Sequence, residues 1–520
     1  MTKNYTVVSV TPEMLMPELG EPACGANSRG GLGILAGDTM AGLAQRGINA
    51  IGFTPLYHQH WMTKETINYD TIAPKAFDQD VLGNQIGVRL INRAGIPVYG
   101  LEHHDIYDSL YTADRGKRLT QEVILGHAVP AVLKKLGIKP DIFWIQEGHC
   151  SVLIPVVLEE LFFAKKRFLF TTHTPVPEGM EKFLVNDFPF DRLKIHGKYY
   201  NTYVHNSFID MTRGSMILTH EANGVSREHE CVTKNMFPEF AHKTRGITNG
   251  SDRGLWLSPR LKGFENTNNI TPTTLAWAHK HDKQDFIDFI ARKTGKKLDP
   301  KKPILGWVRR LAWYKQQHPM LAPVIDAICA DKGTFIEVPC LGRLEGLGFQ
   351  HFGAGRAHES DSERMLWMGE FNNWMEHRLN GKFVFMPEYG LELLQRAAWG
   401  SDIWFSCPKP GMEACGTSEE RAMINGVPDI TTRSGGAAEY LREWSYINCT
   451  GNGFFIDPYQ PISLYFKLKQ ASDLYYDWVL NGNDRWLKLR MNAFETGKTL
   501  DIVPMIEKYE TVFEKLLKMP

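Results

Sequence analysis

Residues 402–436 read DIWFSCPKPGMEACGTSEERAMINGVPDITTRSGG, and their pattern indicates a strand, a loop and a helix in succession. The apolar run DIWFS has strand character, a loop rich in glycine and proline follows it, and a helical pattern begins after the glycine turn. Short apolar strands that alternate with helices are typical of parallel sheets covered on both faces. The sequence therefore predicts an α/β protein. The same pattern recurs after the apolar runs at 141–145, 167–171, 216–219, 304–308, 334–338 and 383–386.

The charged connector Thr294–Lys302, TGKKLDPKK, is the predicted boundary between two α/β halves. It follows a helical pattern and precedes the strand ILGWV, as a connector between domains should. We expect a first Rossmann-like domain over 1–297 and a second over 298–490. The apolar residues of the tail fall on one helical face, so 491–520 are expected to carry a helix that packs back onto the first domain.

Composition and charge exclude several classes of protein. The chain has 520 residues, 43% hydrophobic and 23% charged, as globular proteins do. Its 59 Lys and Arg residues equal its 59 Asp and Glu residues, so it lacks the basic excess of a nucleic-acid or membrane surface. The eight scattered cysteines form no CxxC pair, and no signal-peptide pattern is found at the start. We therefore expect a cytoplasmic protein with reduced thiols.

The segment Arg29–Gly33, RGGLG, opens the helical pattern ILAGDTMAGLAQRG. Glycines before a helix let backbone N–H groups approach an anion, and the helix N-terminus adds about half a positive charge. Gly30, Gly31 and Gly33 are therefore candidates for anion binding. A plain tight turn is the alternative, since the spacing matches neither a Rossmann fingerprint nor a P-loop.

Two cationic residues, Arg310 and Lys315, follow the strand ILGWV. Open α/β sheets bind ligands at the carboxyl ends of their strands. A guanidinium fork beside an ammonium group suits a phosphate or diphosphate. The alternative is a solvated basic loop.

The loop after DIWFS carries a carboxylate, Glu413, just before the glycine turn at Gly416 and Thr417. A helix N-terminus beside a carboxylate can hold a phosphate and a sugar hydroxyl together. An ordinary connection between strand and helix would give the same pattern.

The histidines divide into three groups. His173 follows the strand RFLFTT, again at a carboxyl end, which favours a functional role. His149, in QEGH, either orients a site or lies in the core. A metal site is not expected at His58, His60, His103 and His104, because no further ligands have matching spacing.

Together and in order, these segments resemble the glycogen and α-glucan phosphorylase family of retaining GT-B enzymes. The matching segments are GGLGILAGDTMAGLAQRGINAIGFTPLYHQHW, QEGH, THTPVPEGMEKF, ITNGSDRGLWLSP, RRLAWYK and FVFMPEYGLELLQRAAWGSDIWFSCPKPGMEACGTSEERAMING. The resemblance implies two Rossmann-like domains that face a central cleft. A homodimer would suit it.

The resemblance also implies a role for each matching residue. Arg310 and Lys315 would hold the reacting phosphate, and the loop glycines would present N–H groups from the opposite lobe. His173 would lie beside the reacting carbon, while Asn249 and Glu413 would hold sugar hydroxyls. The implied catalytic residues are His173, Arg310, Lys315 and Glu413, and the implied substrate-binding residues are Gly30, Gly31, Gly33, Asn249, Tyr314, Cys415, Gly416, Thr417 and Arg421.

One departure from the family concerns its cofactor. Phosphorylases bind pyridoxal phosphate through a lysine eight positions after the glutamate of their EASGT segment, and here Arg421 stands eight positions after Glu413. Arginine stays protonated and cannot supply the neutral amine of an imine. We therefore expect no covalent pyridoxal phosphate and no other cofactor. The chain is also shorter than typical phosphorylases.

The segment EACGTSEERAMINGVPDITTRSGGAAEYL is equally similar to the nucleotide-sugar-binding segment of bacterial glycogen synthases. Many of those relatives carry a glutamate where this chain has Arg421, and Glu420 lies one step away. A nucleoside diphosphate brings two linked phosphates, so it could fill the space of a cofactor phosphate and a substrate phosphate.

We therefore favour a retaining transferase that moves a hexosyl unit from a nucleotide sugar to a sugar or glucan acceptor. Two alternatives stay open. One is a phosphorylase that acts on a sugar phosphate without a covalent cofactor. The other is an inactive phosphorylase-like protein that only binds carbohydrate. No nucleic-acid or membrane partner is expected under any of the three.

Overall fold

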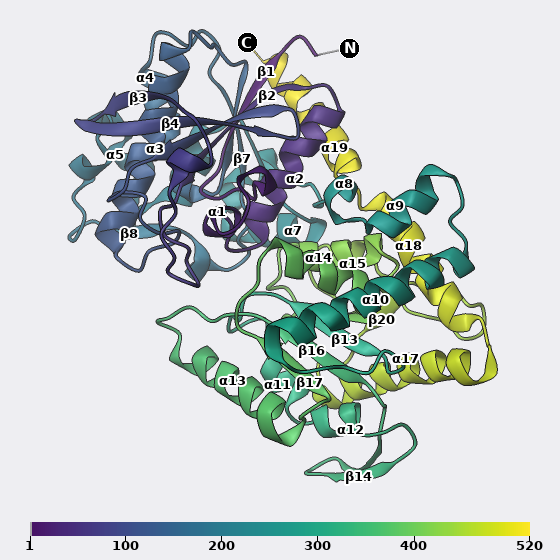
Figure 1. The fold of residues 1–520 in the computed structure, drawn as a ribbon. Coiled ribbons are helices and arrows are strands. Elements are labelled where there is room, and N and C mark those ends of the chain that lie inside the picture. The colour runs from purple at the N-terminus through teal and green to yellow at the C-terminus, as the bar shows by residue number, and fades with distance from the viewer. Residues whose placement is uncertain (1–2, 520) are drawn as a thin grey trace. The chain divides into compact units, whose positions relative to one another are not determined.

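The computed structural model describes residues 3–519 and divides them into two compact units (Figure 1). Unit 1 consists of the residues up to Asp252 together with those from Ile502 onward, and unit 2 is Arg253–Asp501. Each unit has its own parallel sheet with helices on both faces, so the α/β prediction is confirmed.

Unit 1 is built on a nine-stranded sheet whose order is β12-β11-β7-β6-β1-β2-β5-β4-β3. From β12 to β5 each pair of neighbours is parallel, whereas β4 and β3 continue the sheet in antiparallel fashion. In sheet order the strands are β12 (Thr244–Gly246), β11 (Glu221–Gly224), β7 (Arg167–Thr171), β6 (Ile142–Gln146), β1 (Thr6–Val10), β2 (Asn49–Leu56), β5 (Ile96–Glu102), β4 (Asn84–Arg93) and β3 (Lys75–Val81). A small second sheet contains β8 (Lys182–Leu184), β10 (Phe208–Asp210) and β9 (Val204–His205).

Alternating side chains of β6 show how this sheet is covered. Ile142 and Trp144 pack in a cluster with α2 and α19, whereas Phe143 and Ile145 pack in a second cluster with α3 and α4. Strands buried on both faces need such continuous apolar runs. The helices of unit 1 are α1 (Ala23–Ala26), α2 (Gly31–Gln45), α3 (Arg115–Lys135), α4 (Leu153–Glu159), α5 (Tyr200–Tyr203), α6 (Met211–Leu218), α7 (Arg227–Met236) and α19 (Ile502–Leu517).

Unit 2 is built on a six-stranded sheet, and all its neighbouring strands are parallel. In sheet order its strands are β17 (Phe383–Met386), β16 (Gln350–Ala354), β13 (Ile304–Val308), β18 (Ile403–Phe405), β19 (Asp429–Thr431) and β20 (Gly453–Phe455), with a separate hairpin of β14 (Phe335–Val338) and β15 (Gly342–Glu345). Its helices are α8 (Arg253–Trp256), α9 (Pro259–Asn266), α10 (Pro272–Thr294), α11 (Gln317–Leu321), α12 (Ile325–Cys329), α13 (Ser362–Asn373), α14 (Leu391–Gly400), α15 (Thr417–Ile424), α16 (Ala437–Tyr440), α17 (Pro461–Asn481) and α18 (Arg485–Thr499).

The boundary between the units lies at 252/253 and not at the predicted 297/298. The reason is α10, which packs into unit 2. Its Phe286 meets Phe352 of β16 edge to face at 4.9 Å, and its Lys283 forms a buried ion pair with Asp402 at 2.8 Å. The connector after α10 is therefore a loop within unit 2. The tail divides as well, because α18 belongs to unit 2 and only α19 packs in unit 1.

Five of the seven predicted strands appear in the two main sheets, as β6, β7, β13, β17 and β18. The prediction for 216–219 is wrong, because Met216 to Leu218 complete α6 and the strand begins later, as β11. The apolar run at 334–338 forms the hairpin strand β14 instead of a strand of the parallel sheet. All eight cysteines are free thiols. Within residues 3–519 no helix has both the length and the apolar character of a membrane span.

Candidate functional site

The glycine loop leads into α2, but one of the protein's own carboxylates already holds part of it. Gly30 immediately precedes the helix and Gly31 is its first residue. The Glu13 carboxylate, 2% exposed, accepts the N–H of Arg29 at 2.6 Å and that of Gly30 at 3.3 Å. A Cβ atom on Gly33 would lie 2.8 Å from Glu13 Oε2. The structure thus gives Gly33 a packing role, since it lets the carboxylate pass beside the helix.

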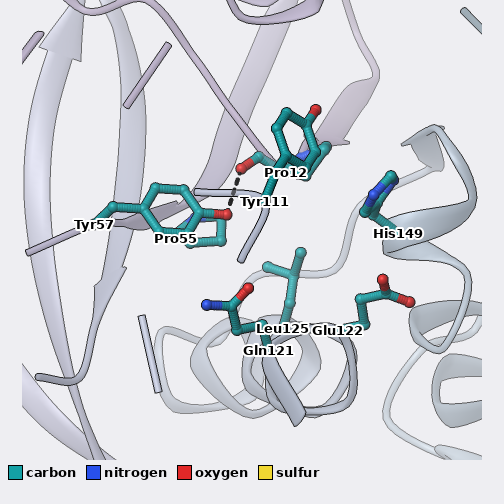
Figure 2. Close-up of a pocket in the computed structure, with 8 residues that line it drawn as sticks. All are labelled: Pro12, Pro55, Tyr57, Tyr111, Gln121, Glu122, Leu125 and His149. Atoms are coloured by element: carbon teal, nitrogen blue, oxygen red, sulfur yellow. Dashed lines mark hydrogen bonds between the residues drawn. The ribbon is translucent and has the colours of Figure 1, made fainter. Parts of the chain in front are cut away.

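Glu13 also connects the loop to a small cavity beside α3. Its other oxygen accepts the hydroxyl of Tyr111 at 2.8 Å, and the Tyr111 ring meets His149 edge to face at 5.4 Å. The cavity has a volume of about 20 Å³, which is room for about one water molecule. Figure 2 shows its lining residues, Pro12, Pro55, Tyr57, Tyr111, Gln121, Glu122, Leu125 and His149.

Glu122, His149 and Glu181 lie close enough together for each to offer an atom to one metal ion. Arginines already balance this group. Arg118 contacts His149 Nε2 at 2.8 Å and is paired with Glu181, and Arg115 contacts Glu181 at 2.8 Å. These cations, with His149, bring the pKa of Glu181 down to about 2 despite burial. Burial and the charge of Glu181 raise the pKa of Glu122 well above its usual range.

His173 lies two residues after β7, at the strand end where the sequence predicted it. It is held by Gln146, the last residue of β6, and by Glu147, which follows that strand. Its Nε2 is 2.8 Å from Gln146 Oε1, and its backbone N–H donates to Glu147. Glu147 also accepts the hydroxyl of Thr174 at 2.9 Å. Burial, followed by the charge of His229, lowers the pKa of His173 to about 3. His173 is therefore neutral at physiological pH. The Gln146 oxygen can only accept, so the proton lies on Nε2.

The sequence-predicted residues of unit 1 all follow carboxyl ends of its parallel strands. The loop that ends at Gly30 follows β1, His173 follows β7, and Asn249 follows β12. Asn249 is buried, and its backbone N–H donates to the Val225 carbonyl at 3.3 Å. The carboxyl edge of a parallel sheet is where such folds bind ligands.

In unit 2 Arg309, the residue before the predicted Arg310, contacts Glu413. Arg309 follows β13 and is 7% exposed, whereas the adjacent Arg310 is exposed. Arg309 Nη2 donates to Glu413 Oε2 at 2.7 Å, and Nη1 contacts Ser406 and lies 3.6 Å from Glu419. Consecutive residues of an extended chain point to opposite sides, so the two arginines face different surroundings.

Lys315 and Glu413, both predicted site residues, form an ion pair. Lys315 Nζ lies 2.9 Å from Glu413 Oε2 and 5.2 Å from the centre of the Tyr314 ring. Tyr314 also accepts the backbone N–H of Lys409 at 2.7 Å, which ties the loop after β13 to the loop after β18. The structure therefore brings Tyr314, Lys315 and Glu413 together at the carboxyl edge of the unit 2 sheet.

The remaining predicted residues of unit 2 form the start of α15. Gly416 precedes the helix and Thr417 is its first residue. A Cβ atom on Gly416 would lie 2.5 Å from Glu419 Oε2, so Gly416 leaves room for that carboxylate. Cys415 Sγ lies 3.5 Å from Glu420 Oε1. The first turn of α15 thus carries two carboxylates, and each makes a contact beside the residues that the sequence assigned to an anion pocket.

Glu419 and Asp429 show opposite electrostatics within this buried region. Burial raises the pKa of the Glu419 carboxyl, but Arg309, Ser406 and Ser418 together outweigh it, and the pKa lies below its usual value. Asp429, on β19, has no hydrogen-bond partner for either carboxylate oxygen among the described residues. Burial and the charges of Glu419 and Glu420 raise the pKa of Asp429 well above its usual range. Arg309 makes the largest contribution to lowering the pKa of Glu419.

The comparisons with known proteins agree with this geometry. Residues 11–237 match the family model of the starch synthase catalytic domain. Maltodextrin phosphorylase of Thermococcus litoralis is 25% identical over 78% of this chain, and glycogen synthase of Elusimicrobium minutum is 23% identical over 76%. The catalytic domain of starch synthase IV from Arabidopsis thaliana, bound to ADP and acarbose, matches 99% of this chain and 100% of that chain with a TM-score of 0.76 and 16% identity. The chain is therefore similar to glycogen and starch synthases and to glucan phosphorylases, and it has the GT-B fold.

The chain differs in length from both kinds of protein that it resembles. It spans 58% of the maltodextrin phosphorylase and 76% of the glycogen synthase. The predicted GT-B fold is confirmed by the starch synthase match, and the resemblance to the glycogen enzymes is confirmed by both relatives.

Position 421 does not fit the pyridoxal phosphate of the phosphorylases. The Arg421 guanidinium lies over the Trp256 ring at 4.5 Å from its centre, and the residue is buried. Asn425, which follows the last residue of α15, donates its side-chain amide to the Trp256 carbonyl at 2.9 Å, so the end of α15 is tied to α8. A guanidinium cannot form an imine, and this one packs face-on against an aromatic ring.

Sequence reasoning missed four residues that hold the site: Glu13, Gln146, Glu147 and Arg309. Gln146 and Glu147 belong to the QEGH motif, of which only the histidine was weighed. The doublet Arg309-Arg310 carried a usable signal, because one of two adjacent residues after a buried strand must point inward. Glu13 lies too far from the glycine loop in sequence, and no local pattern connects the two.

Proposed function

We propose that this chain is a retaining glycosyltransferase that moves a hexosyl unit from a nucleotide sugar to a sugar or glucan acceptor, without pyridoxal phosphate. Arg421 carries the proposal, because it replaces the imine-forming lysine and packs on Trp256. The starch synthase domain of the same fold was bound to ADP and acarbose, a nucleoside diphosphate and a carbohydrate-like ligand.

The chemistry proposed for unit 2 is stabilisation of a leaving diphosphate. Arg309, Lys315 and the adjacent Arg310 place cations at the carboxyl edge of the sheet. Fixed cations in a poorly hydrated site stabilise charge that develops on a leaving phosphate as the sugar becomes oxocarbenium-like. Glu413 lies among them and would accept a sugar hydroxyl.

The role proposed for unit 1 is to orient the sugar. His173 is neutral, and its Nε2 proton points to Gln146, which leaves Nδ1 as an acceptor for a sugar hydroxyl. Asn249 would offer an amide to a second hydroxyl. Gly30, Gly31 and Gly33 set the entry to α2, whose N-terminus favours negative charge.

The test is a pair of assays on the purified full chain. The first supplies ADP-glucose or UDP-glucose with a maltooligosaccharide and measures released nucleoside diphosphate. The second supplies maltooligosaccharide and phosphate, with and without pyridoxal phosphate, and measures glucose 1-phosphate. We expect turnover in the first assay alone. Glucose 1-phosphate formation together with pyridoxal absorbance would overturn the proposal in favour of phosphorolysis. Carbohydrate binding without turnover in either assay would leave only a binding protein.

A further inference from the structure

One carboxylate oxygen of unit 2 is the acceptor for two cations. Glu413 Oε2 lies 2.7 Å from Arg309 Nη2 and 2.9 Å from Lys315 Nζ. All three side chains are largely shielded from water, with exposures of 12% for Glu413, 6% for Arg309 and 11% for Lys315. Glu413 therefore keeps one cationic partner if the other one leaves.

The two cations differ in how firmly they are held. The Arg309 guanidinium contacts Glu413, Ser406 and Glu419 at the same time, so it cannot turn away without losing several contacts. Lys315 contacts Glu413 and the Tyr314 ring, and its ammonium sits on a flexible four-carbon stem. Of the two, Lys315 is the cation that can exchange its partner.

We infer that Arg309 is a positioning residue that neutralises Glu413 and thereby releases Lys315 to bind the phosphate of the donor. In this account Lys315 leaves Glu413 when a phosphate arrives, and Arg309 keeps the carboxylate in place for the sugar. The inference rests on the proposed function for its donor. It concerns a residue that neither the sequence motifs nor the resemblance assigned.

The inference differs from a purely structural role for Arg309 in one measurable way. Without Arg309, Glu413 would have Lys315 as its only cation in this cluster and would hold it more tightly. Phosphate binding would then weaken because Lys315 is sequestered, even though Lys315 itself is intact. Removing the charge of Glu413 would free Lys315 again. A structural arginine predicts no such rescue.

The experiment measures ADP binding by calorimetry with the full chain and three variants. Arg309→Gln should weaken ADP binding about 10- to 100-fold, the effect of losing one charge-assisted contact. Adding Glu413→Gln to Arg309→Gln should restore the affinity to within about threefold of the unsubstituted chain. The matched control adds Glu443→Gln instead, which neutralises a unit 2 carboxylate paired with Lys467 at 2.7 Å and should restore nothing.

A conservative variant keeps the test decisive if Arg309→Gln does not fold. Arg309→Lys retains the charge but loses the planar fork, so it should weaken ADP binding less, and Glu413→Gln should rescue it in the same way. Thermal unfolding and circular dichroism identify which variants are folded.

The outcomes separate this inference from the proposed function. If Glu413→Gln restores no more affinity than Glu443→Gln, Arg309 is only structural and the inference is overturned. If the unsubstituted chain does not bind ADP, the nucleotide-sugar donor is overturned, and the same variants are measured with glucose 1-phosphate. Rescue with that probe supports the positioning role on its own. Failure of both probes to bind overturns the inference as well.

Discussion

Glu147 of unit 1 and Glu413 of unit 2 both follow parallel strands, but they are held in opposite ways. Glu147 accepts two backbone N–H groups and a hydroxyl, from Gly148, His173 and Thr174. Glu413 forms ion pairs with two cations, Arg309 and Lys315. Burial raises the pKa of Glu147, which fits a carboxylate without a directly bonded cation. The Glu147 carboxylate of unit 1 thus fixes the backbone, whereas the Glu413 carboxylate of unit 2 pairs with cationic side chains.

The backbone at Glu147 supports this reading. Its φ is 66°, in the left-handed region that residues other than glycine rarely adopt. Such a conformation costs about 1–3 kcal/mol and persists where the surroundings impose it. The three donors around the carboxylate are those surroundings, and they tie the turn at Glu147 to the loop that carries His173.

The largest effect is expected from removing the exchangeable cation of unit 2. Lys315→Met should lower kcat for a nucleotide-sugar donor about 100- to 1000-fold, because a cation that stabilises the leaving phosphate is lost. Steady-state release of nucleoside diphosphate measures it. Lys467→Met, which removes a lysine paired with Glu443, is the matched control and should change kcat little. Equal losses in both variants would contradict a special role for Lys315.

The second prediction concerns the fixed carboxylate of unit 1. Glu147→Gln replaces one acceptor oxygen by an NH₂ group, which cannot accept the hydrogen bonds that the carboxylate accepts. The free energy of unfolding should therefore fall by about 2 kcal/mol. Displacement of His173 should lower kcat about 10-fold. Urea unfolding and steady-state kinetics measure the two effects.

Glu160→Gln provides the control for that variant, since Glu160 forms a half-exposed pair with Lys134 at 2.6 Å. Its stability should change by less than about 1 kcal/mol. If Glu147→Gln is as stable as Glu160→Gln, the Glu147 carboxylate does not fix the backbone of unit 1, and the contrast with Glu413 is wrong.

The third prediction tests a property that the units share. Burial lowers the pKa of His351 in unit 2 to about 3, and its Nε2 accepts the Trp307 indole N–H at 2.7 Å. The pKa of the unfolded histidine is about 6.5, so the unfolded chain binds the proton first as the pH falls. The contribution of neutral His351 to the free energy of unfolding is complete above pH ~6.5. It is lost as the pH falls below that value, by about 2 kcal/mol between pH 7 and pH 5.

His351→Gln should therefore show about 2 kcal/mol less acid destabilisation than the unsubstituted chain when urea unfolding at pH 7 and pH 5 is compared. His229 of unit 1, with a pKa lowered to about 4 by burial, should behave in the same way. His242→Gln makes the same substitution at an exposed position and is the matched control. An unchanged pH dependence in His351→Gln would show that this histidine is protonated in the folded state.

The smallest effect is expected at the contact that replaces the cofactor lysine. Arg421→Leu should lower the free energy of unfolding by about 1 kcal/mol through loss of the cation over Trp256. Arg421→Lys keeps a cation and should lose less. Urea unfolding followed by tryptophan fluorescence measures both. If lysine destabilised more than leucine, the contact would not be a cation–π interaction.

Much of the architecture could be predicted because it depends on local patterns. Five strand predictions appear in the main sheets, since a short apolar run between turn residues leaves few alternatives. The strand prediction for residues 216–219 was wrong because the apolar end of an amphipathic helix resembles a strand when only four residues are considered. The boundary at 297/298 failed because a charged connector marks a surface loop and does not show which sheet its flanking helix packs against.

The site was predictable to the extent that it follows strand ends. Lys315, Glu413 and His173 lie at the carboxyl edges of their sheets, as their position after apolar runs indicated. Which of Arg309 and Arg310 faces Glu413 depends on the register of the chain as it leaves β13, and the motif alone does not contain it. Glu13 and the glycine loop meet only through the tertiary fold.

The discontinuity of unit 1 has a consequence for the order in which the protein is made. Ile502 donates its N–H to the Ser251 carbonyl at 3.1 Å, so the end of one segment meets the start of the next. On the ribosome, all of unit 2 emerges before α19 does. Until then Trp144, Leu35 and Met40 lack the apolar face of α19 that completes their cluster. Unit 2 can therefore complete its folding first. Unit 1, although most of it is synthesised earlier, keeps this apolar cluster exposed until α19 emerges, and exposed apolar surface favours chaperone binding.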